Sequence, residues 1–276
     1  MKRFAKEFWI FGLKQVSASI FGGALLLAIL LTEYSPWNGG MHRYDMLFLI
    51  ALCIQGVLIA TRMEEPKEII VILVFHIVAT LMELFKTSDG IGAWYYPGVQ
   101  DAYFTISNVP LFAGFMYSAV GSYIARSWRI FNFQFERFPP LWISGIVSAL
   151  IYFNFFTHHI LPDIRYLLLV IILLLFGRTF ILFRVVEHHW KMPYIVGIGL
   201  VALFIWIAEN VSTFGTVWLY PNQIDGWAVV PIAKVLSWFL LLIVSFVLVA
   251  VVHKSSMRAA VRTRAEISSE IKNARD

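Results

Sequence analysis

Continuous apolar runs alternate with short polar segments along the chain. They cover residues 15–32, 44–61, 69–86, 109–125, 141–157, 165–186, 194–211 and 229–252. A helix of about 20 apolar residues crosses the roughly 30 Å hydrocarbon core of a bilayer. Backbone amides in lipid must be satisfied within the segment, and these runs do not alternate as β-barrel strands would. The pattern therefore predicts an all-α integral membrane protein with eight transmembrane helices.

The two ends of the chain differ from these apolar runs. Residues 1–14 mix Phe and Trp with Lys, which is typical of a helix lying at the lipid surface. No small-residue cleavage site follows the first run, and further runs come after it, so we do not expect a signal peptide. Residues 253–276 are polar, charged and free of Gly and Pro. They predict a basic cytoplasmic tail that lies against anionic head groups.

The positions of Lys and Arg orient the predicted helices. If the N-terminus is inside, only Arg43, Lys86 and Arg165 of the 22 Lys and Arg fall outside. Three more, Lys14, Arg178 and Lys234, fall in or at the edges of helices. Because cytoplasmic loops carry the excess of Lys and Arg, both termini are predicted to be cytoplasmic. We expect a multi-pass protein of the bacterial cytoplasmic (inner) membrane.

Composition supports the membrane class. The chain has 276 residues, of which 59% are hydrophobic and 14% are charged. Soluble domains carry about 25% charged residues, so a soluble enzyme and a disordered chain are both excluded. The single Cys53 lacks a partner for an intrachain disulfide. The net charge of +5 lies mostly between the apolar runs, so it does not indicate nucleic-acid binding.

Two halves of the chain share motifs at nearly fixed spacing. Glu83-x3-Thr87, Trp94-x-Tyr96-Pro97 and Val109-Pro110 recur as Glu209-x3-Thr213, Trp218-x-Tyr220-Pro221 and Val230-Pro231, at offsets of 126, 124 and 121. Arg43-Tyr44 recurs as Arg165-Tyr166, and Tyr117 and Trp238 each follow the second Pro by seven residues. We interpret residues 15–130 and 131–252 as two parallel four-helix repeats, related by an axis along the membrane normal.

The candidate catalytic residues lie on the third and seventh runs. They are Glu83, Glu209, His76, Thr87 and Thr213. The spacing of His76, Glu83 and Thr87 places them on one helix face. Two carboxyls in a low-dielectric site can divide the roles of acid and base, and such a pair can protonate an alkene or activate water. The two Thr would orient the two acids.

Polar and aromatic residues near the outer ends of the helices are the candidate substrate-binding residues. They are Trp94, Tyr96, Trp218, Tyr220, Arg43, Asn154, His158, Arg165, Arg178 and Lys234. Polar groups inside a membrane are costly and usually functional. Aromatic faces can also stabilise a developing cation. These residues predict a polar, aromatic chamber that opens at the outer leaflet.

Two other interpretations of the same residues remain open. His158, His159 and Asp163, with His76 or the two acids, could bind a metal, although adjacent residues on a helix point about 100° apart. Alternatively, Arg43 and Arg165 could neutralise Glu209 and Glu83 in a purely structural role. The sequence has no phosphate-binding Gly loop, catalytic triad order or His-Glu-x-x-His motif, so no cofactor is expected.

Four segments resemble a known family. The strings HIVATLMELFKTSDGIGAWYYP (His76 to Pro97), VPLFAGFMYSAVGSY (Val109 to Tyr123), NFFTHHILPD (Asn154 to Asp163) and AENVSTFGTVWLYP (Ala208 to Pro221) closely resemble the YoaT-like family of bacterial inner-membrane proteins. The resemblance covers residues 40–250. That family has no assigned function, so the resemblance implies a fold type and location only.

A weaker similarity covers about 35 residues in each half. Glu83-x3-Thr87, the following Gly and aromatic-x-Tyr, and Val109-Pro110-Leu111 are similar to a motif of membrane carotenoid hydratases and, more distantly, lycopene cyclases. The similarity implies acidic residues that protonate a polyene double bond. Trp94-Tyr95-Tyr96 stands where the hydratase pattern has a Pro-Phe-Gly stretch, which leaves the substrate and the activity open.

The favoured hypothesis is a membrane enzyme that acts on a lipid or isoprenoid at the outer leaflet, as a hydratase- or cyclase-like lyase or isomerase. The partners implied are the bilayer and that small molecule. An ion- or proton-coupled small-molecule transporter is the alternative, because duplicated halves with membrane acids are typical of carriers. A non-catalytic membrane scaffold is the third interpretation.

Overall fold

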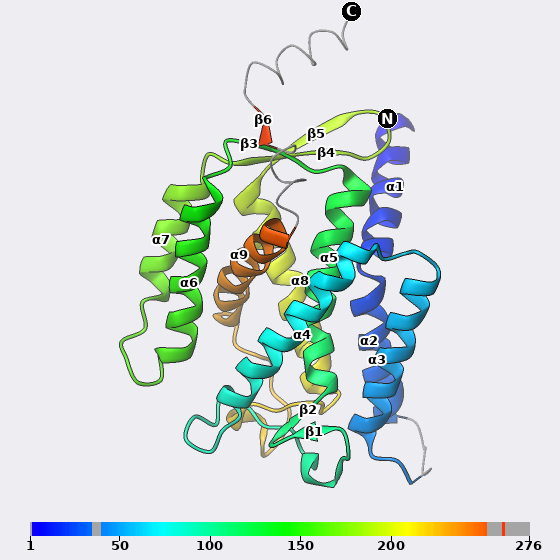
Figure 1. Cartoon of the computed structure of the whole chain (residues 1–276), viewed down its shortest axis with the longest axis vertical. Coiled ribbons are helices and arrows are strands. Elements are labelled where there is room, and N and C mark those ends of the chain that lie inside the picture. The colour runs from blue at the N-terminus through cyan, green and yellow to red at the C-terminus, as the bar shows by residue number, and fades with distance from the viewer. Residues whose placement is uncertain (1, 35–39, 253–260, 263–276) are drawn as a thin grey trace, which may run out of the picture.

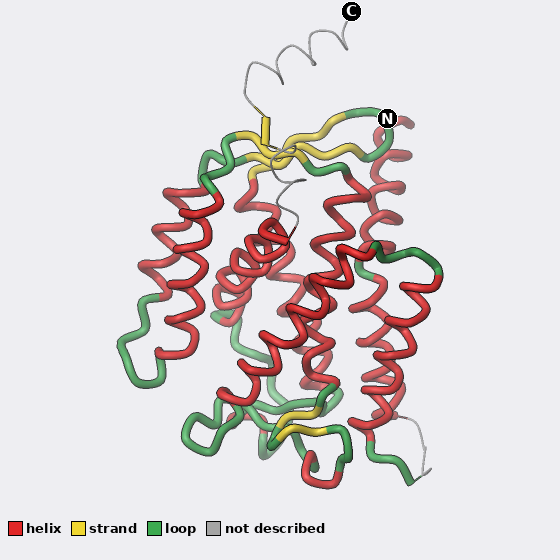
Figure 2. Tube along the Cα trace, in the orientation of Figure 1, coloured by secondary structure: helices red, strands yellow, loops and turns green. Residues whose placement is uncertain are grey.

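The computed structural model describes residues 2–34, 40–252 and 261–262, and this part of the chain is mostly helical (Figures 1 and 2). The helices are α1 (Lys2–Ala18), α2 (Ile20–Tyr34), α3 (Arg43–Ala60), α4 (Pro66–Lys86), α5 (Phe112–Phe131), α6 (Leu141–Thr157), α7 (Arg165–Phe176), α8 (Tyr194–Phe214) and α9 (Lys234–Val252). Two 3-10 turns, Val99–Asp101 and Pro221–Gln223, lie in the loops.

Four of the described helices, α3, α4, α8 and α9, are long and apolar enough to cross a membrane. The segments Phe4–Ala18 and Ile20–Tyr34 would make a fifth span together, although they are bent by 66° where they meet. Helices α6 and α7 are apolar but shorter. The described chain is therefore a helical protein with four or five candidate membrane-spanning helices.

A small β-sheet closes one end of the helical bundle (Figure 1). Its strands are β3 (Gln134–Glu136), β4 (Phe180–Arg184), β5 (His189–Pro193) and β6 (Val261–Arg262), in the order β5-β4-β3-β6. Strand β4 pairs antiparallel with both β3 and β5, and β6 pairs parallel with β3. The start of α1 lies at the same end, as Figure 1 shows.

The opposite end of the bundle is made by long loops (Figure 2). The short strands β1 (Thr105–Ile106) and β2 (Val109–Pro110) pair there. The loop after α4 and the loop after α8 also meet at this end. Tyr95 and Leu219 pair antiparallel, with backbone hydrogen bonds of 3.0 Å in each direction. This pairing joins two loops that are more than a hundred residues apart in the chain.

The apolar run 165–186 was expected to form one helix, and this prediction is wrong. Helix α7 ends at Phe176, and Phe180–Arg184 form β4, an inner strand of the sheet. Short apolar runs do not distinguish strand from helix by periodicity, and here β3 and β5 satisfy the backbone groups of β4. Arg178 consequently lies in an exposed turn rather than at mid-helix. The sheet also corrects the purely all-α class.

The run 109–125 also begins differently from the prediction. Val109 and Pro110 belong to β2, and the helix starts at Phe112 and continues to Phe131. The Pro removes a donor and disfavours helical backbone at the residue before it, which explains the later start.

Residues 2–14 of the expected interfacial segment 1–14 lie within helix α1, where Phe4, Phe8 and Trp9 are exposed. Exposed aromatic side chains fit a helix in contact with lipid. Of the expected basic tail, 253–276, only β6 is described, and the rest lies outside the described residues.

The largest apolar core lies near the sheet. Phe135, Phe138, Tyr194 and Phe246 pack ring against ring there, with centroid separations of 5.2–5.9 Å where they touch. They come from β3, the loop after it, α8 and α9. This core holds the sheet end together, and the polar groups described next lie toward the opposite end.

Candidate functional site

Glu83 lies in the last turn of α4 and is 1% exposed. Its Oε2 accepts hydrogen bonds from Trp94 Nε1 at 2.8 Å and from the Tyr96 hydroxyl at 2.9 Å. Its Oε1 accepts a hydrogen bond from the Tyr117 hydroxyl at 2.8 Å. Three neutral donors thus surround this buried carboxyl, and burial of a carboxyl requires such partners.

The loop after α4 brings these donors back to Glu83. Thr87 is the C-cap of the helix, and its backbone N–H and hydroxyl both donate to the Glu83 carbonyl at 2.9 Å. The Ala93 N–H then donates to the Lys86 carbonyl at 2.9 Å, so the loop returns beside the helix end. Trp94 follows directly and reaches the acid. The sequence spacing Glu83-x10-Trp94 is therefore the length of one closed loop.

Thr87 and Thr213 were expected to orient the two acids, and the structure contradicts this role. The Thr87 hydroxyl binds the helix backbone, and the Thr213 hydroxyl donates to the Asn210 carbonyl at 3.2 Å. Thr213 also accepts a hydrogen bond from Trp227 Nε1 at 3.2 Å. Thr side chains near helix ends commonly bond to the preceding turn, which explains the repeated Glu-x3-Thr element without chemistry.

Glu209 of α8 has a similar environment and is 3% exposed. Its Oε1 accepts a hydrogen bond from the Tyr220 hydroxyl at 2.5 Å, and its Oε2 accepts one from Trp238 Nε1 at 2.8 Å. Tyr220 and Trp238 hold the positions in the second half that Tyr96 and Tyr117 hold in the first. Both acids are thus held by aromatic side chains from matching places in the sequence.

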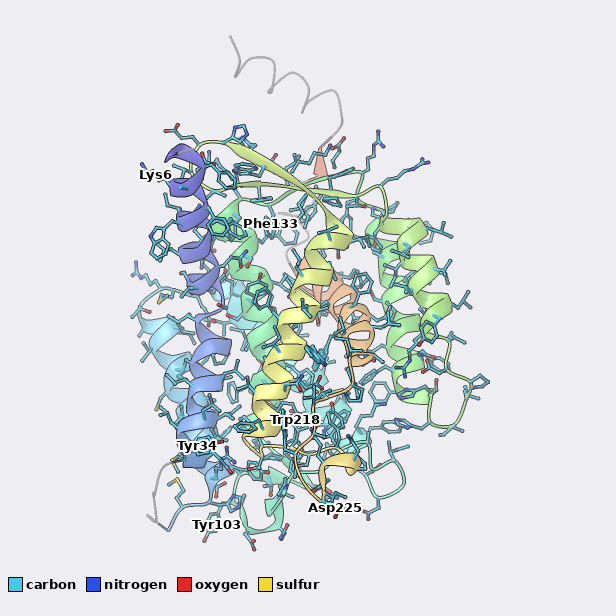
Figure 3. All side chains as sticks on the ribbon, turned by 180° about the vertical axis from the view of Figure 1, so that it is seen from behind. Lys6, Tyr34, Tyr103, Phe133, Trp218 and Asp225 are labelled. Atoms are coloured by element: carbon cyan, nitrogen blue, oxygen red, sulfur yellow. The ribbon has the colours of Figure 1, made fainter. Side chains whose placement is uncertain are left out.

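The two aromatic cages touch each other. Trp94 packs edge-on against Tyr220 with ring centroids 6.3 Å apart, and Tyr117 lies 6.4 Å from Trp238. Trp218 lies toward the loop end of the bundle (Figure 3) and lines the same cavity as these four residues. These contacts bring the partners of Glu83 against the partners of Glu209.

Both acids line one cavity of about 980 Å³. The cavity extends from Phe8 of α1 and Gly22 of α2, past Met116 of α5, to the two acids. Its other lining residues include Trp94, Tyr96, Tyr117, Trp218, Tyr220, Trp238, Asn154, His158, Arg165 and Lys234. The cavity is large enough for a chain-like small molecule, since ligand pockets measure roughly 300–1,000 Å³.

The phenols in the loops remain hydrogen-bond donors. Burial raises the pKa of Tyr96 well above its ordinary value of 10.0, and the charge of Glu83 raises it further. Burial and then the charge of Glu209 raise the pKa of Tyr220 in the same way. Both phenols therefore keep their protons at neutral pH and can stabilise negative charge on the carboxyls.

The turn between α6 and α7 forms a polar wall of the cavity. The Asn154 amide donates to Asp163 Oδ1 at 3.1 Å, and its oxygen accepts from the Ile164 N–H at 3.0 Å. Asp163 forms an ion pair with Arg165. The side chain of Asn154 therefore fixes the turn that presents Arg165 to the cavity.

Neither predicted Arg–Glu pair forms. Arg43 forms an ion pair with Glu33 at 2.5 Å and donates to the Ile29 carbonyl at 2.8 Å, and Arg165 pairs with Asp163. The expectation that Arg43 and Arg165 neutralise Glu209 and Glu83 is therefore wrong. The reason is local: each Arg finds a partner beside it in sequence or on the neighbouring helix, and the acids are occupied by aromatic donors.

His76 does not reach the acids. Its ring packs against Phe115 with centroids 4.7 Å apart, and a Cβ added at Gly114 would lie 2.4 Å from its Nδ1. The ring thus fills the space that Gly114 leaves on α5. Its Nδ1 is buried and has no hydrogen-bond partner in the described part of the chain. His76 belongs to the α4–α5 contact rather than to the cavity.

No group of three or more His, Cys, Asp or Glu side chains in the described part of the chain could hold a metal ion. His158 Nδ1 lies 3.2 and 3.0 Å from the carbonyls of Asn154 and Phe155, and His159 Nε2 lies 2.9 Å from Lys86 Nζ. Asp163 is occupied by Arg165. The alternative metal site at His158, His159 and Asp163 is therefore not formed.

Sequence reasoning missed three residues of the site. Tyr117 and Trp238 bind the acids directly, and their matched position seven residues after a Pro was the signal that could have identified them. Lys86 also lines the cavity and is 1% exposed. It was counted only as a loop charge, since its position in sequence does not reveal its burial.

Two comparisons identify relatives. A family model described as "Protein of unknown function (DUF817)" matches residues 7–246. The chain is also 37% identical over 248 residues to the uncharacterized protein YoaT of Bacillus subtilis (strain 168), covering 90% of this chain and 92% of that protein. The resemblance to the YoaT-like family is thus confirmed, whereas the weaker similarity to carotenoid hydratases and lycopene cyclases stays a prediction. No solved structure matches the chain.

Proposed function

The chain belongs to the family of proteins of unknown function DUF817, and we propose that it is a membrane enzyme that performs acid–base chemistry on a lipid or isoprenoid held in its cavity. One observation carries this proposal: Glu83 and Glu209, from equivalent sequence motifs, line the same cavity. Two carboxyls on one cavity supply the acid and the base that proton transfer requires.

The chemistry follows from the two carboxyls. One of them gives its proton to an alkene carbon of the bound molecule, and the neighbouring carbon becomes positive. The other carboxyl accepts a proton, either from the adjacent carbon, which gives an isomer, or from a water molecule that adds to the cation, which gives a hydrate. Proton exchange between the two acids restores the starting state, so no other reactant is consumed than water.

The aromatic cages suit this reaction. The hydroxyls of Tyr96 and Tyr117 and the N–H of Trp94 donate to Glu83, so they stabilise the carboxylate that remains after proton donation. Ring faces of the same residue types attract a positive carbon. We therefore add Tyr117 and Trp238 to the residues proposed to line the substrate, which are Trp94, Tyr96, Trp218 and Tyr220.

The proposal includes two repeats, α2–α5 and α6–α9. Within each set, successive helices alternate in direction along the bundle, and α2 to α5 run in the same directions as α6 to α9 taken in order (Figure 1). The backbone pair Tyr95–Leu219 joins equivalent loop positions at an offset of 124, the offset that also relates Trp94 to Trp218. An antiparallel pair of equivalent residues is what a two-fold axis between two copies would produce.

We further propose that all eight helices of these repeats cross the inner membrane, with both termini cytoplasmic and the acids toward the outer leaflet. The excess of Lys and Arg in the loops at the sheet end supports this orientation. Helices α6 and α7 are shorter, so the residues that flank them would span the rest of the membrane thickness.

The test compares lipid and pigment extracts of a deletion strain with strains that carry the wild-type protein, Glu83→Gln, Glu209→Gln or the control Glu187→Gln. Glu187 is an exposed carboxyl in the turn between β4 and β5. We expect a compound that changes on deletion to be restored by the wild type and by Glu187→Gln, and by neither acid variant. Identical extracts in all strains would remove the enzyme proposal.

Transport is the second candidate, because the cavity lies between two equivalent sets of helices. Carriers of this type bind their cargo where helices are broken at mid-membrane, yet the helices that carry the acids, α4 and α8, are continuous. This difference favours the enzyme. Flux measured in reconstituted vesicles distinguishes the two functions, because an enzyme of this kind moves no solute across the bilayer.

A further inference from the structure

Lys86 is a buried cation at the edge of the cavity. It is 1% exposed, and its Nζ contacts the Phe155 carbonyl at 2.5 Å and His159 Nε2 at 2.9 Å. The same Nζ lies 4.2 Å from the centre of the Phe155 ring. An ammonium has three N–H donors, so these two polar contacts leave one donor for another acceptor.

No carboxylate in the described residues forms an ion pair with Lys86. Much of the His159 ring is exposed, but its Nε2 faces Lys86. Burial and the Lys86 ammonium lower the pKa of His159 to about 4, so this imidazole is neutral at pH 7 and accepts a hydrogen bond from Lys86. A buried ammonium that forms no ion pair is unfavourable unless an anion compensates its charge.

Two further cations line the same cavity. Lys234, the first residue of α9, lines the cavity and places its Nζ 4.2 Å from the centre of the Tyr220 ring. It is attracted electrostatically by Glu209 but forms no ion pair with any described residue. Arg165 also lines the cavity, but Asp163 compensates its charge. Lys86 and Lys234 line the same cavity.

We propose that Lys86 and Lys234 bind the oxyanion head group, a phosphate or a carboxylate, of an amphiphile whose apolar chain occupies the rest of the cavity. The remaining lining, from Phe8 and Leu25 to Met116, is largely apolar and suits a hydrocarbon or isoprenoid chain. A cationic head group fits less well, because the oxygens of Glu83 and Glu209 already accept hydrogen bonds, whereas Lys86 forms no ion pair with a described carboxylate.

This inference names the substrate class of the proposed function. It rests on the proposed function in one respect, that the cavity is the binding site. It needs no turnover, so binding and catalysis are tested separately. Trp94, Trp218 and Trp238 line the cavity and report occupancy by fluorescence.

The experiment measures quenching of tryptophan fluorescence in the purified full-length protein in detergent. The probes are hexadecyl phosphate and palmitate, each carrying bromine on the tail, the matching brominated alcohol as the neutral chain, and inorganic phosphate as competitor. We expect both anionic probes to bind at least about tenfold more tightly than the alcohol, which corresponds to about 1.4 kcal/mol. Displacement by inorganic phosphate alone would identify a free anion rather than an amphiphile as the ligand, and would overturn the proposal.

The variants are Lys86→Gln and Lys234→Gln, with Lys86→Arg keeping the charge and Lys67→Gln as control. Lys67 is an exposed lysine at the other end of the same helix. Each Gln variant should lose about tenfold or more in affinity for the anionic probes and none for the alcohol, whereas Lys67→Gln should match the wild type.

Unchanged affinity in both Gln variants, or equal binding of alcohol and phosphate by the wild type, overturns the proposal. Lys86→Arg and Lys234→Gln keep the test decisive if Lys86→Gln does not fold. The purified Glu83→Gln protein should still bind the anionic probes. If the probes bind but deletion changes no compound in the extracts, the enzyme proposal fails and this proposal stands.

Discussion

The replacement Tyr117→Phe tests the aromatic cage of Glu83. Tyr117 is the only described donor to Oε1 of this carboxyl, whereas Oε2 accepts from both Trp94 and Tyr96. Removal of the Tyr117 hydroxyl leaves a buried oxygen without a described donor, which costs about 1–3 kcal/mol of unfolding free energy. Tyr96→Phe leaves Trp94 on the same oxygen, so it should cost less, about 0.5–1.5 kcal/mol.

Tyr152 of α6 provides a matched control, because it lines a smaller pocket together with Tyr117. Its hydroxyl reaches the Val78 carbonyl only at 3.5 Å, which is too long for a strong hydrogen bond. Tyr152→Phe should therefore change the unfolding free energy by no more than about 0.5 kcal/mol. The three variants remove the same atom and differ only in what that atom binds.

The assay is thermal unfolding of each purified variant in the same detergent. Each kcal/mol corresponds to roughly 2–4 °C in Tm for chains of this general size. The expected order of the decrease is Tyr117→Phe, then Tyr96→Phe, then Tyr152→Phe. Equal decreases for Tyr117→Phe and Tyr152→Phe would show that the Tyr117 hydroxyl does not hold Glu83, and the cage would have to be abandoned.

Three further predictions follow from single contacts. Gly114→Ala places a Cβ 2.4 Å from His76 Nδ1 and should destabilise the α4–α5 contact by about 1–3 kcal/mol, whereas Gly199→Ala, which meets nothing within 4 Å, should not; Tm values that fall equally would refute the contact. Because Lys86 helps to lower the pKa of His159 to about 4, Lys86→Gln should raise that pKa toward 6.5 in an NMR titration, and an unchanged value would contradict the contact. Burial raises the pKa of Glu64, a residue between α3 and α4, above 4.5, so its contribution to stability is full below 4.5 and is lost as pH rises. Glu64→Gln should make the dependence of Tm on pH flatter as the pH rises above 4.5, and a profile like that of the wild type would count against this assignment.

Several parts of the site could be predicted from the sequence because they depend on local spacing. The loop from Glu83 to Trp94 closes on itself, so its motif alone indicated that acid and aromatic belong together. The equivalent motif in the second half, with two fewer residues between acid and Tyr, placed Glu209 and Tyr220 in the same predicted chamber. Tyr117 and Trp238 occupy matched positions in the two halves, but a single sequence does not show that they contact the acids. That contact depends on which face of each helix packs against the preceding loop.

Other parts depended on contacts between distant segments. The structural alternative paired Arg43 and Arg165 with the acids because opposite charges attract, yet the two Arg form ion pairs with Glu33 and Asp163 instead. His76 and Glu83 are spaced to lie on one face of α4, but the His76 ring packs into the space that Gly114 of α5 leaves. Spacing along a helix fixes relative direction only, and the neighbour on each face decides the contact.

The sequence by itself determined a helical membrane protein with twin acids, because the length of an apolar run and the spacing of a closed loop are local properties. Only the tertiary structure decided that β3 and β5 pair with Phe180–Arg184 and divert it from a helix, and that Lys86 is enclosed beside the cavity. Both outcomes depend on backbone hydrogen bonds and packing between segments far apart in the chain, and residue type alone does not encode these.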